Sequence, residues 1–146
     1  MADPVKSKWE DIERKDGFYF TFTVPGLLAA TSTNYTETKV IRHPMEVLRA
    51  SEVHTTAGTD AGAVTLDIQR LTGTTAPGSG TSILASTFNA KSTANTVVSK
   101  EGAGLASNRQ FREGERLGLA VSGVLTALAG VSITLYCKPL GRGDYR

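Results

Sequence analysis

The histidines, serines and single cysteine of this 146-residue chain are the residues that could supply a base or a nucleophile. A hydrolase needs a nucleophile, a base and an orienting acid, and only His43 and His54 are available as histidine bases. No Gly-x-Ser-x-Gly elbow presents a serine. His43 precedes Pro44 in an expected turn, and His54 ends an expected strand. We interpret both as surface or hydrogen-bonded histidines, and we predict that the chain has no catalytic residues and is not an enzyme.

Two pairs of acidic residues could serve glycoside hydrolysis if they flanked a cleft. Each pair lies among basic residues, which favours ion pairs at the surface or at an interface over catalysis. The pairs and their basic neighbours are Asp11 and Glu13 followed by Arg14 and Lys15, and Glu113 and Glu115 beside Arg112 and Arg116.

Metal, cofactor and phosphate sites each require a ligand spacing that this sequence lacks. One cysteine and two histidines match no zinc pattern, and Asp60 has no neighbouring carboxylates that could complete a calcium loop. The glycine-rich run 78–82 has no lysine after its last glycine to hold a phosphate. We therefore predict no metal and no cofactor. Cys137 lies in an alternating apolar run, so we expect a buried thiol without an internal disulfide.

The last six residues, 141–146, contain Arg142-Gly143-Asp144, a tripeptide that adhesion receptors recognise in animal proteins. Three residues match by chance in many sequences, so this match alone assigns no function. We interpret residues 141–146 as a flexible tail, which is either a contact arm or simply a terminus.

Charge and hydropathy exclude two classes of partner. Sixteen basic against fourteen acidic residues give a net charge of +2, which is too small for the basic surface of a typical nucleic-acid-binding protein. No apolar stretch reaches the roughly 18 residues of a transmembrane helix, and residues 1–16 are too charged for a signal peptide. We expect a soluble protein, made in the host cytoplasm, that binds neither nucleic acid nor membrane.

Alternating apolar and polar residues, separated by glycine and proline turns, predict an all-β fold. Regular strands are expected at 18–24, 64–69, 117–121 and 131–137, and a bulged strand at 45–55. Shorter strands are expected at 40–41, 96–98 and 109–111, with loops at 27–38 and 71–81. This spacing is typical of an antiparallel β-sandwich of about seven to nine strands, with a jelly roll as our preferred version. It would occupy residues 17–140.

Residues 1–16 differ from the rest of the chain because most of them are charged, and Trp9 and Ile12 are their large apolar side chains. These two residues are three apart, so one helical turn would place them on the same face. We interpret the segment either as an extended N-terminal arm that docks on a neighbouring subunit or as a terminus that folds back on its own domain.

Three segments between Met45 and Lys138 carry a resemblance to a known architecture. They are the turn and strand 57–68, the loop 75–84, and the closing strands 114–119 and 131–135. In this order they resemble a β-sandwich module of tailed-bacteriophage virion proteins, including capsid decoration (cement) proteins and fibre domains. The resemblance implies a trimeric module, exposed on a particle and without catalytic residues, and it assigns no individual site residue.

The resemblance also implies a role in assembly. We expect a bacteriophage structural protein that forms a homotrimer on the capsid exterior and stabilises the virion by binding across neighbouring subunits of the major capsid protein. Its arm would place apolar anchors in a groove and cations against acidic capsid surface. The expected capsid or inter-subunit contact residues are Lys6, Lys8, Trp9, Ile12, Arg14 and Lys15.

A head or tail fibre or collar module that binds a host receptor or glycan is the alternative role. The glycine-, threonine- and serine-rich loops at one end of the sandwich would form its binding surface. Sugar sites commonly stack rings on tyrosine or tryptophan. Outside the arm the candidates Tyr19, Tyr35, Tyr136 and Tyr145 form no cluster in the sequence, and we therefore prefer decoration.

Overall fold

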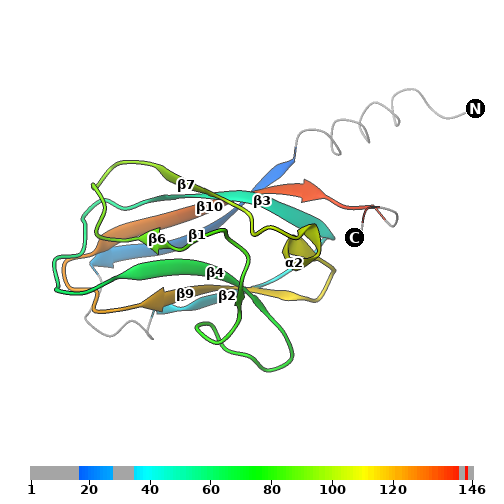
Figure 1. Ribbon diagram of the computed structural model, residues 1–146, viewed down its shortest axis with the longest axis horizontal. Helices are drawn as coiled ribbons and strands as arrows, with labels where there is room; N and C mark the ends of the chain where they lie inside the picture. Colours follow the sequence, from blue (N-terminus) through cyan, green and yellow to red (C-terminus); the bar gives the residue numbers. More distant parts are fainter. Residues whose placement is uncertain (1–16, 28–34, 142–143, 145–146) are drawn as a thin grey trace, which may run out of the picture.

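Ten β-strands and one short helix form in the described part of the chain, which comprises residues 17–27, 35–141 and 144 of this computed structural model (Figure 1). The elements are β1 (Phe18–Leu27), β2 (Glu37–Val40), β3 (Met45–Val53), β4 (Thr65–Leu71), β5 (Thr81–Ser82), β6 (Phe88–Asn89), β7 (Val98–Glu101), α2 (Ala106–Arg109), β8 (Gln110–Phe111), β9 (Arg116–Ser122) and β10 (Ala129–Pro139). The expected arm, residues 1–16, and most of the expected tail lie outside the described residues.

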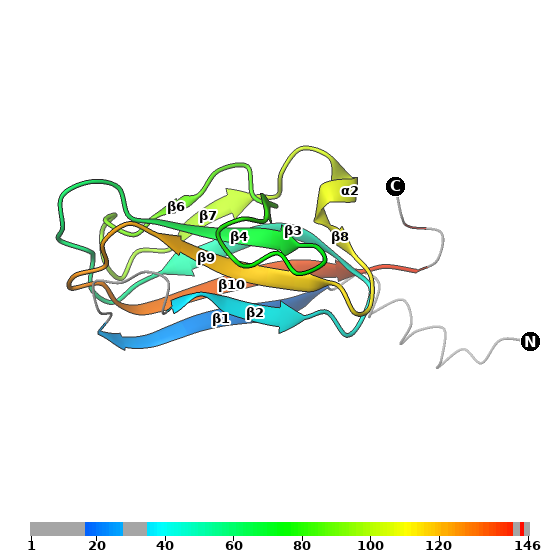
Figure 2. The same ribbon diagram turned by 90° about the horizontal axis from the view of Figure 1, so that it is seen from below.

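The strands form two antiparallel sheets that pack face to face (Figure 2). The first sheet has the order β1-β10-β3-β7, and β8 also pairs with β3. The second sheet has the order β2-β9-β4-β5, and β6 also pairs with β4. No helix among the described residues is long and apolar enough to span a membrane. The all-β antiparallel sandwich expected from the sequence is confirmed, while the jelly roll stays a prediction.

The core lies between the sheets because strand geometry turns alternate side chains inward. Phe22 of β1 pairs with Ile133 of β10, and Ile68 of β4 pairs with Leu119 of β9. All four side chains are fully buried. Cys137 is buried in the same core, as its place in an alternating apolar run predicted.

A β-bulge in β3 explains why its apolar residues change parity. Where β10 advances by one residue, its partner in β3 moves from Arg49 to Val47, so Leu48 is an extra residue. Val47 before the bulge and Ala50 after it are therefore both fully buried. The bulge expected within 45–55 is confirmed.

Several strand boundaries differ from the expected ones. β1 does not end at Pro25-Gly26 but continues to Leu27, because an edge strand tolerates a proline that donates no hydrogen bond. β2 occupies Glu37–Val40 instead of 40–41, so the expected loop 27–38 extends too far. β7 begins only at Val98, where the chain starts to pair with β3. Arg109 ends α2 and does not begin the strand expected at 109–111.

The loop after β4 packs against the outer face of the second sheet. The side-chain oxygen of Gln69 accepts hydrogen bonds from the backbone N–H groups of Gly78 at 2.8 Å and Gly80 at 3.2 Å. Gln69 is therefore only 8% exposed, although it faces away from the core. The alternation of apolar and polar residues predicted this strand, but it did not show that the following loop would cover the outer face of the strand.

Candidate functional site

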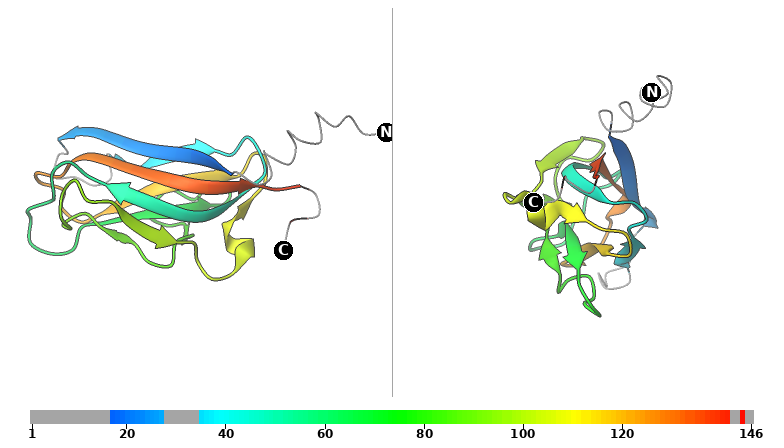
Figure 3. Two further views of the ribbon diagram at one scale, coloured as in Figure 1. Left: turned by 90° about the horizontal axis from the view of Figure 1, so that it is seen from above. Right: turned by 90° about the vertical axis from the view of Figure 1, so that its right-hand side faces the viewer.

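β1 and β2 are edge strands of different sheets, and they lie along the same side of the sandwich (Figure 2). On the opposite side, backbone hydrogen bonds join the two layers: Ala85 N donates to Glu101 O at 2.9 Å, and Ala103 N donates to Ile83 O at 2.7 Å. Figure 3 shows β1 at the margin of its sheet. Among the described residues no such backbone hydrogen bonds connect β1 with β2.

β2 turns two charged side chains toward the interior of the sandwich. Glu37 pairs with Leu119 and Lys39 pairs with Leu117 of β9, and paired residues of antiparallel strands share one face. Glu37 and Lys39 are half-buried and form an ion pair of 3.0 Å. Inward-pointing charges on an edge strand discourage the addition of another strand.

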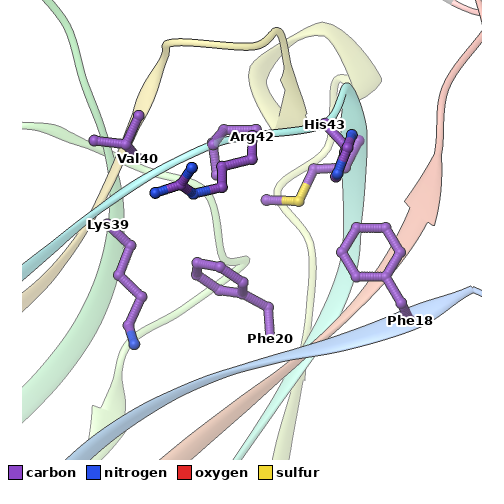
Figure 4. A pocket seen from close by; sticks show the side chains of 8 residues that line it. Phe18, Phe20, Lys39, Val40, Arg42 and His43 are labelled. Carbon is purple, nitrogen blue, oxygen red and sulfur yellow. The ribbon is translucent and has the colours of Figure 1, made fainter.

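A groove of about 390 Å³ lies between β1 and the segment that contains β2 (Figure 4). Its floor is apolar and includes the half-buried Phe18 and Phe20 of β1 and the buried Met45. Lys39 lies at one margin, where its Nζ is 5.5 Å from the ring centre of Phe20 and 5.3 Å from that of Phe22. The ammonium group therefore makes cation–π contacts at the edge of an apolar surface.

The margin of the groove is cationic. Lys39 and Arg42 line it together with His43 and with Val40, which is 57% exposed, and the described residues that line it include no acidic side chain (Figure 4). Apolar floor and cationic margin together suit an apolar group that carries negative charge beside it. His43, which the sequence placed in a turn without a role, is thus part of the site.

A second hollow of about 500 Å³ adjoins the groove. The two share Phe18 and His43, and the second is also lined by Gly17 and Leu140. Gly17 has a φ of +59°, and a Cβ at this position would lie 2.6 Å from the backbone oxygen of Cys137. The chain therefore enters β1 at this end of the groove in a conformation that only glycine adopts without strain.

His54 forms a buried pair with Glu52, away from the groove. Its Nδ1 lies 2.8 Å from Glu52 Oε1, and its Nε2 donates to Ser92 O at 3.0 Å. Both side chains are inaccessible to solvent. Burial raises the pKa of the Glu52 carboxyl, and the hydrogen bond and charge of His54 offset part of the rise. His54 is therefore a hydrogen-bonded core histidine, which was one of the two interpretations of the sequence.

Two further residues that the sequence singled out for possible chemistry, Glu115 and Cys137, are held by an ion pair and by burial. Glu115 forms an ion pair with Arg70, so its partner comes from β4 and could not be read from the flanking sequence. Cys137 is fully buried, and burial raises the pKa of its thiol to about 12. The described residues contain no group of three or more His, Cys, Asp or Glu side chains that could hold a metal ion.

Two tyrosines that are far apart in the sequence meet on the outer face of the first sheet. Tyr19 pairs with Tyr136 and Tyr136 pairs with Arg49 across three adjacent strands. The tyrosine ring centres are 5.6 Å apart, and the Arg49 guanidinium lies 5.3 Å from the Tyr136 ring centre. Tyr19 is 69% exposed. The sequence contained no signal for this cluster because strand order was not deducible from it.

All six contact residues expected on the arm lie outside the described residues, so the structure places none of them: Lys6, Lys8, Trp9, Ile12, Arg14 and Lys15. Comparisons with protein-family models, with curated proteins and with solved structures found no match to this chain. The resemblance to phage virion modules therefore stays a prediction from the sequence.

Proposed function

We propose that this protein works by binding other protein subunits and not by catalysis. The groove between β1 and β2 carries the proposal, because there the buried apolar face of β1 continues into the half-buried Phe20 and Phe18. An apolar floor with a polar margin is the general anatomy of a protein–protein contact. The groove would therefore bind a segment of another subunit in a larger assembly.

Within this class, decoration of a bacteriophage capsid is the role that we propose. Strand pairing is nested, since β1 pairs with β10, β2 with β9 and β4 with β5, and this order supports the jelly-roll interpretation. Jelly rolls recur in viral capsid proteins and lectins. Because a fold alone does not assign a function, the proposal depends on the groove and on the resemblance in the sequence together.

In this proposal the protein forms a homotrimer on the exterior of the virion and binds across neighbouring subunits of the major capsid protein. The sandwich would supply area and geometry, and the arm of residues 1–16 would supply charged and apolar contacts. Lys39 and Arg42 add cationic side chains, and His43 adds an imidazole, near the end of the sandwich where this arm joins it.

Co-sedimentation with undecorated phage capsids tests this role. We expect the full-length protein to pellet with capsids at a saturable stoichiometry, and Val40→Glu to lose binding because it adds a negative charge to the groove. Val97→Glu is the matched control, since Val97 is 66% exposed, Val40 is 57% exposed, and Val97 does not line the groove. A wild-type protein that stays in the supernatant, or a Val40→Glu variant that binds like wild type, contradicts the proposal.

Glycan binding is the second candidate function, and the cluster of Tyr19, Tyr136 and Arg49 favours it. The cluster combines an exposed ring for stacking with a guanidinium that can donate hydrogen bonds. It replaces the loops as the expected sugar surface. On a glycan array, Tyr19→Ala should remove binding while Leu105→Ala, a substitution at an equally exposed apolar residue, should not. An array with no wild-type signal refutes this candidate.

A further inference from the structure

We propose that the groove binds residues 8–13 of a second copy of this chain, with Trp9 and Ile12 as the apolar anchors. This inference rests on the proposed assembly function and names the occupant of the groove. It is carried by the uncovered floor of the groove, by the charges that line it, and by the place where residues 1–16 join the sandwich.

The uncovered floor is the inward face of β1. Phe22 on this face is fully buried, whereas Phe20 and Phe18, nearer the start of the strand, are only half-buried. The hollows that meet at Phe18 enclose about 390 and 500 Å³, which is the size range of binding pockets. The described residues therefore leave this end of the core open to another apolar group.

The charges of the groove match those of the segment 8–13. Arg42 and Lys39 line the apolar floor, with Lys39 ion-paired to Glu37 of its own strand, and the described residues that line the groove include no acidic side chain. The segment reads Lys-Trp-Glu-Asp-Ile-Glu, so two acidic residues separate its two large apolar side chains and a third follows them. Seating Trp9 and Ile12 on the floor would bring these carboxylates to the cationic margin.

The position of Gly17 argues for a second copy over the chain's own segment. Gly17 lines the second hollow, and the described residues of β1 that line the groove are Phe18 and Phe20. At about 3.3 Å per residue, an extended segment that reversed at Gly17 would lay the charged residues 13–16 over the phenylalanines. Trp9 and Ile12 would then pass beyond the groove.

A segment from another copy has no such constraint. With Trp9 and Ile12 on one helical turn, the five residues from Ile12 to Gly17 can span up to about 18 Å when extended, which lets both anchors reach the groove of a neighbouring sandwich. The contact is heterologous, because the arm of one copy meets the groove of the next. Heterologous contacts close into rings when the rotation between copies allows it, and a ring of three copies is one closed assembly that this contact permits.

Cysteine cross-linking between full-length chains tests the proposal. One chain carries Asp11→Cys, which keeps both anchors, and the other carries Val40→Cys in the groove; Val97→Cys replaces the latter as the control. Cys137 does not interfere because it is fully buried. We expect the mixture with Val40→Cys to form at least about ten times as much two-chain disulfide as the Val97→Cys control. Docking holds the two thiols at a millimolar effective concentration, which accelerates the reaction between them.

A yield equal to that of the Val97→Cys control overturns the proposal. So does a chain with both Asp11→Cys and Val40→Cys that forms only an internal disulfide, because the groove would then hold its own segment. Capsid binding without cross-linking overturns the occupant alone. Cross-linking without capsid binding supports the occupant and contradicts the role in decoration.

The fluorescence of Trp9, the single tryptophan of the chain, gives a second readout without any cysteine. In the full-length protein its emission should lie at shorter wavelength than that of a free tryptophan, and dilution should shift it to longer wavelength as copies separate. Val40→Glu should produce the same shift at high concentration. Emission that stays at the position of free tryptophan at every concentration contradicts docking, and buried emission that does not change on dilution contradicts a second copy.

Discussion

Replacing His54 with leucine is expected to destabilise the fold strongly, because it leaves Glu52 buried without a partner. The substitution removes the contacts of 2.8 Å to Glu52 and 3.0 Å to Ser92 O. Glu52 is 1% exposed, and its Oε2 already has no hydrogen-bond partner among the described residues. The carboxyl group must then either remain charged in the core or take up a proton on folding.

The cost of protonation sets the magnitude of the effect. The ordinary pKa of Glu52 is 4.5, and each unit between this value and the solution pH costs about 1.4 kcal/mol. At pH 7 protonation therefore costs about 3.4 kcal/mol. Because the pKa of Glu52 is already raised beside His54, this is the upper limit of what the carboxyl adds to the loss, and it lies near the low end of the roughly 3–5 kcal/mol typical for breaking a buried pair. A domain of this size is stable by only about 5–15 kcal/mol, so the variant should be folded but close to its limit.

Urea unfolding at pH 7 and pH 5 measures this cost. A folded-state pKa raised above 4.5 gives stability that is fully present below that value and is lost as pH rises. The gap between wild type and His54→Leu should therefore shrink on going from pH 7 to pH 5. The double variant Glu52→Leu with His54→Leu has no buried charge and should be more stable than His54→Leu alone. A double variant less stable than His54→Leu, or a gap that widens at pH 5, would refute this reasoning.

Two further predictions concern the core and a turn. The pKa of the Cys137 thiol is about 12 against an ordinary 9.0, and this rise of three units lowers its thiolate fraction roughly a thousandfold. Ellman's reagent should therefore label Cys137 in urea but not in the native protein at pH 8. Gly123→Ala should destabilise the fold by more than Gly62→Ala, by about 1–3 kcal/mol. Both glycines have positive φ, +97° and +88°, but only at Gly123 would a Cβ clash with the backbone oxygen of Ala63, whereas Gly62 has open space. Equal losses in chemical denaturation would show that the clash is relieved.

The sequence predicted the sandwich because alternation, turns and the bulge in β3 are local signals. The change of parity between Val47 and Ala50 required an extra residue, and the structure contains it at Leu48. Boundaries were less accurate where pairing partners decide them. β2 was misplaced because the inward-facing Glu37 and Lys39 remove the apolar alternation that identifies a strand.

The groove could not be predicted because it depends on which strands lie at the edges. The alternation in the sequence predicts that Phe18 and Phe20 are core residues. They are only half-buried because β1 lies at the margin of its sheet. The tyrosine cluster has the same origin, since Tyr19 and Tyr136 meet through the pairing of β1 with β10. The pair of Glu52 with His54 was hidden as well, because the sequence placed the histidine at the end of a strand without showing that its surroundings are buried.

Sedimentation velocity of the full-length protein over a range of concentrations tests the central claim, that the protein assembles through the groove. We predict a small oligomer, with the mass of a trimer, for wild type and for Val97→Glu, and a monomer for Val40→Glu at the same concentrations. A wild-type protein that is monomeric throughout, or an oligomer whose mass is unchanged by Val40→Glu, would contradict the account.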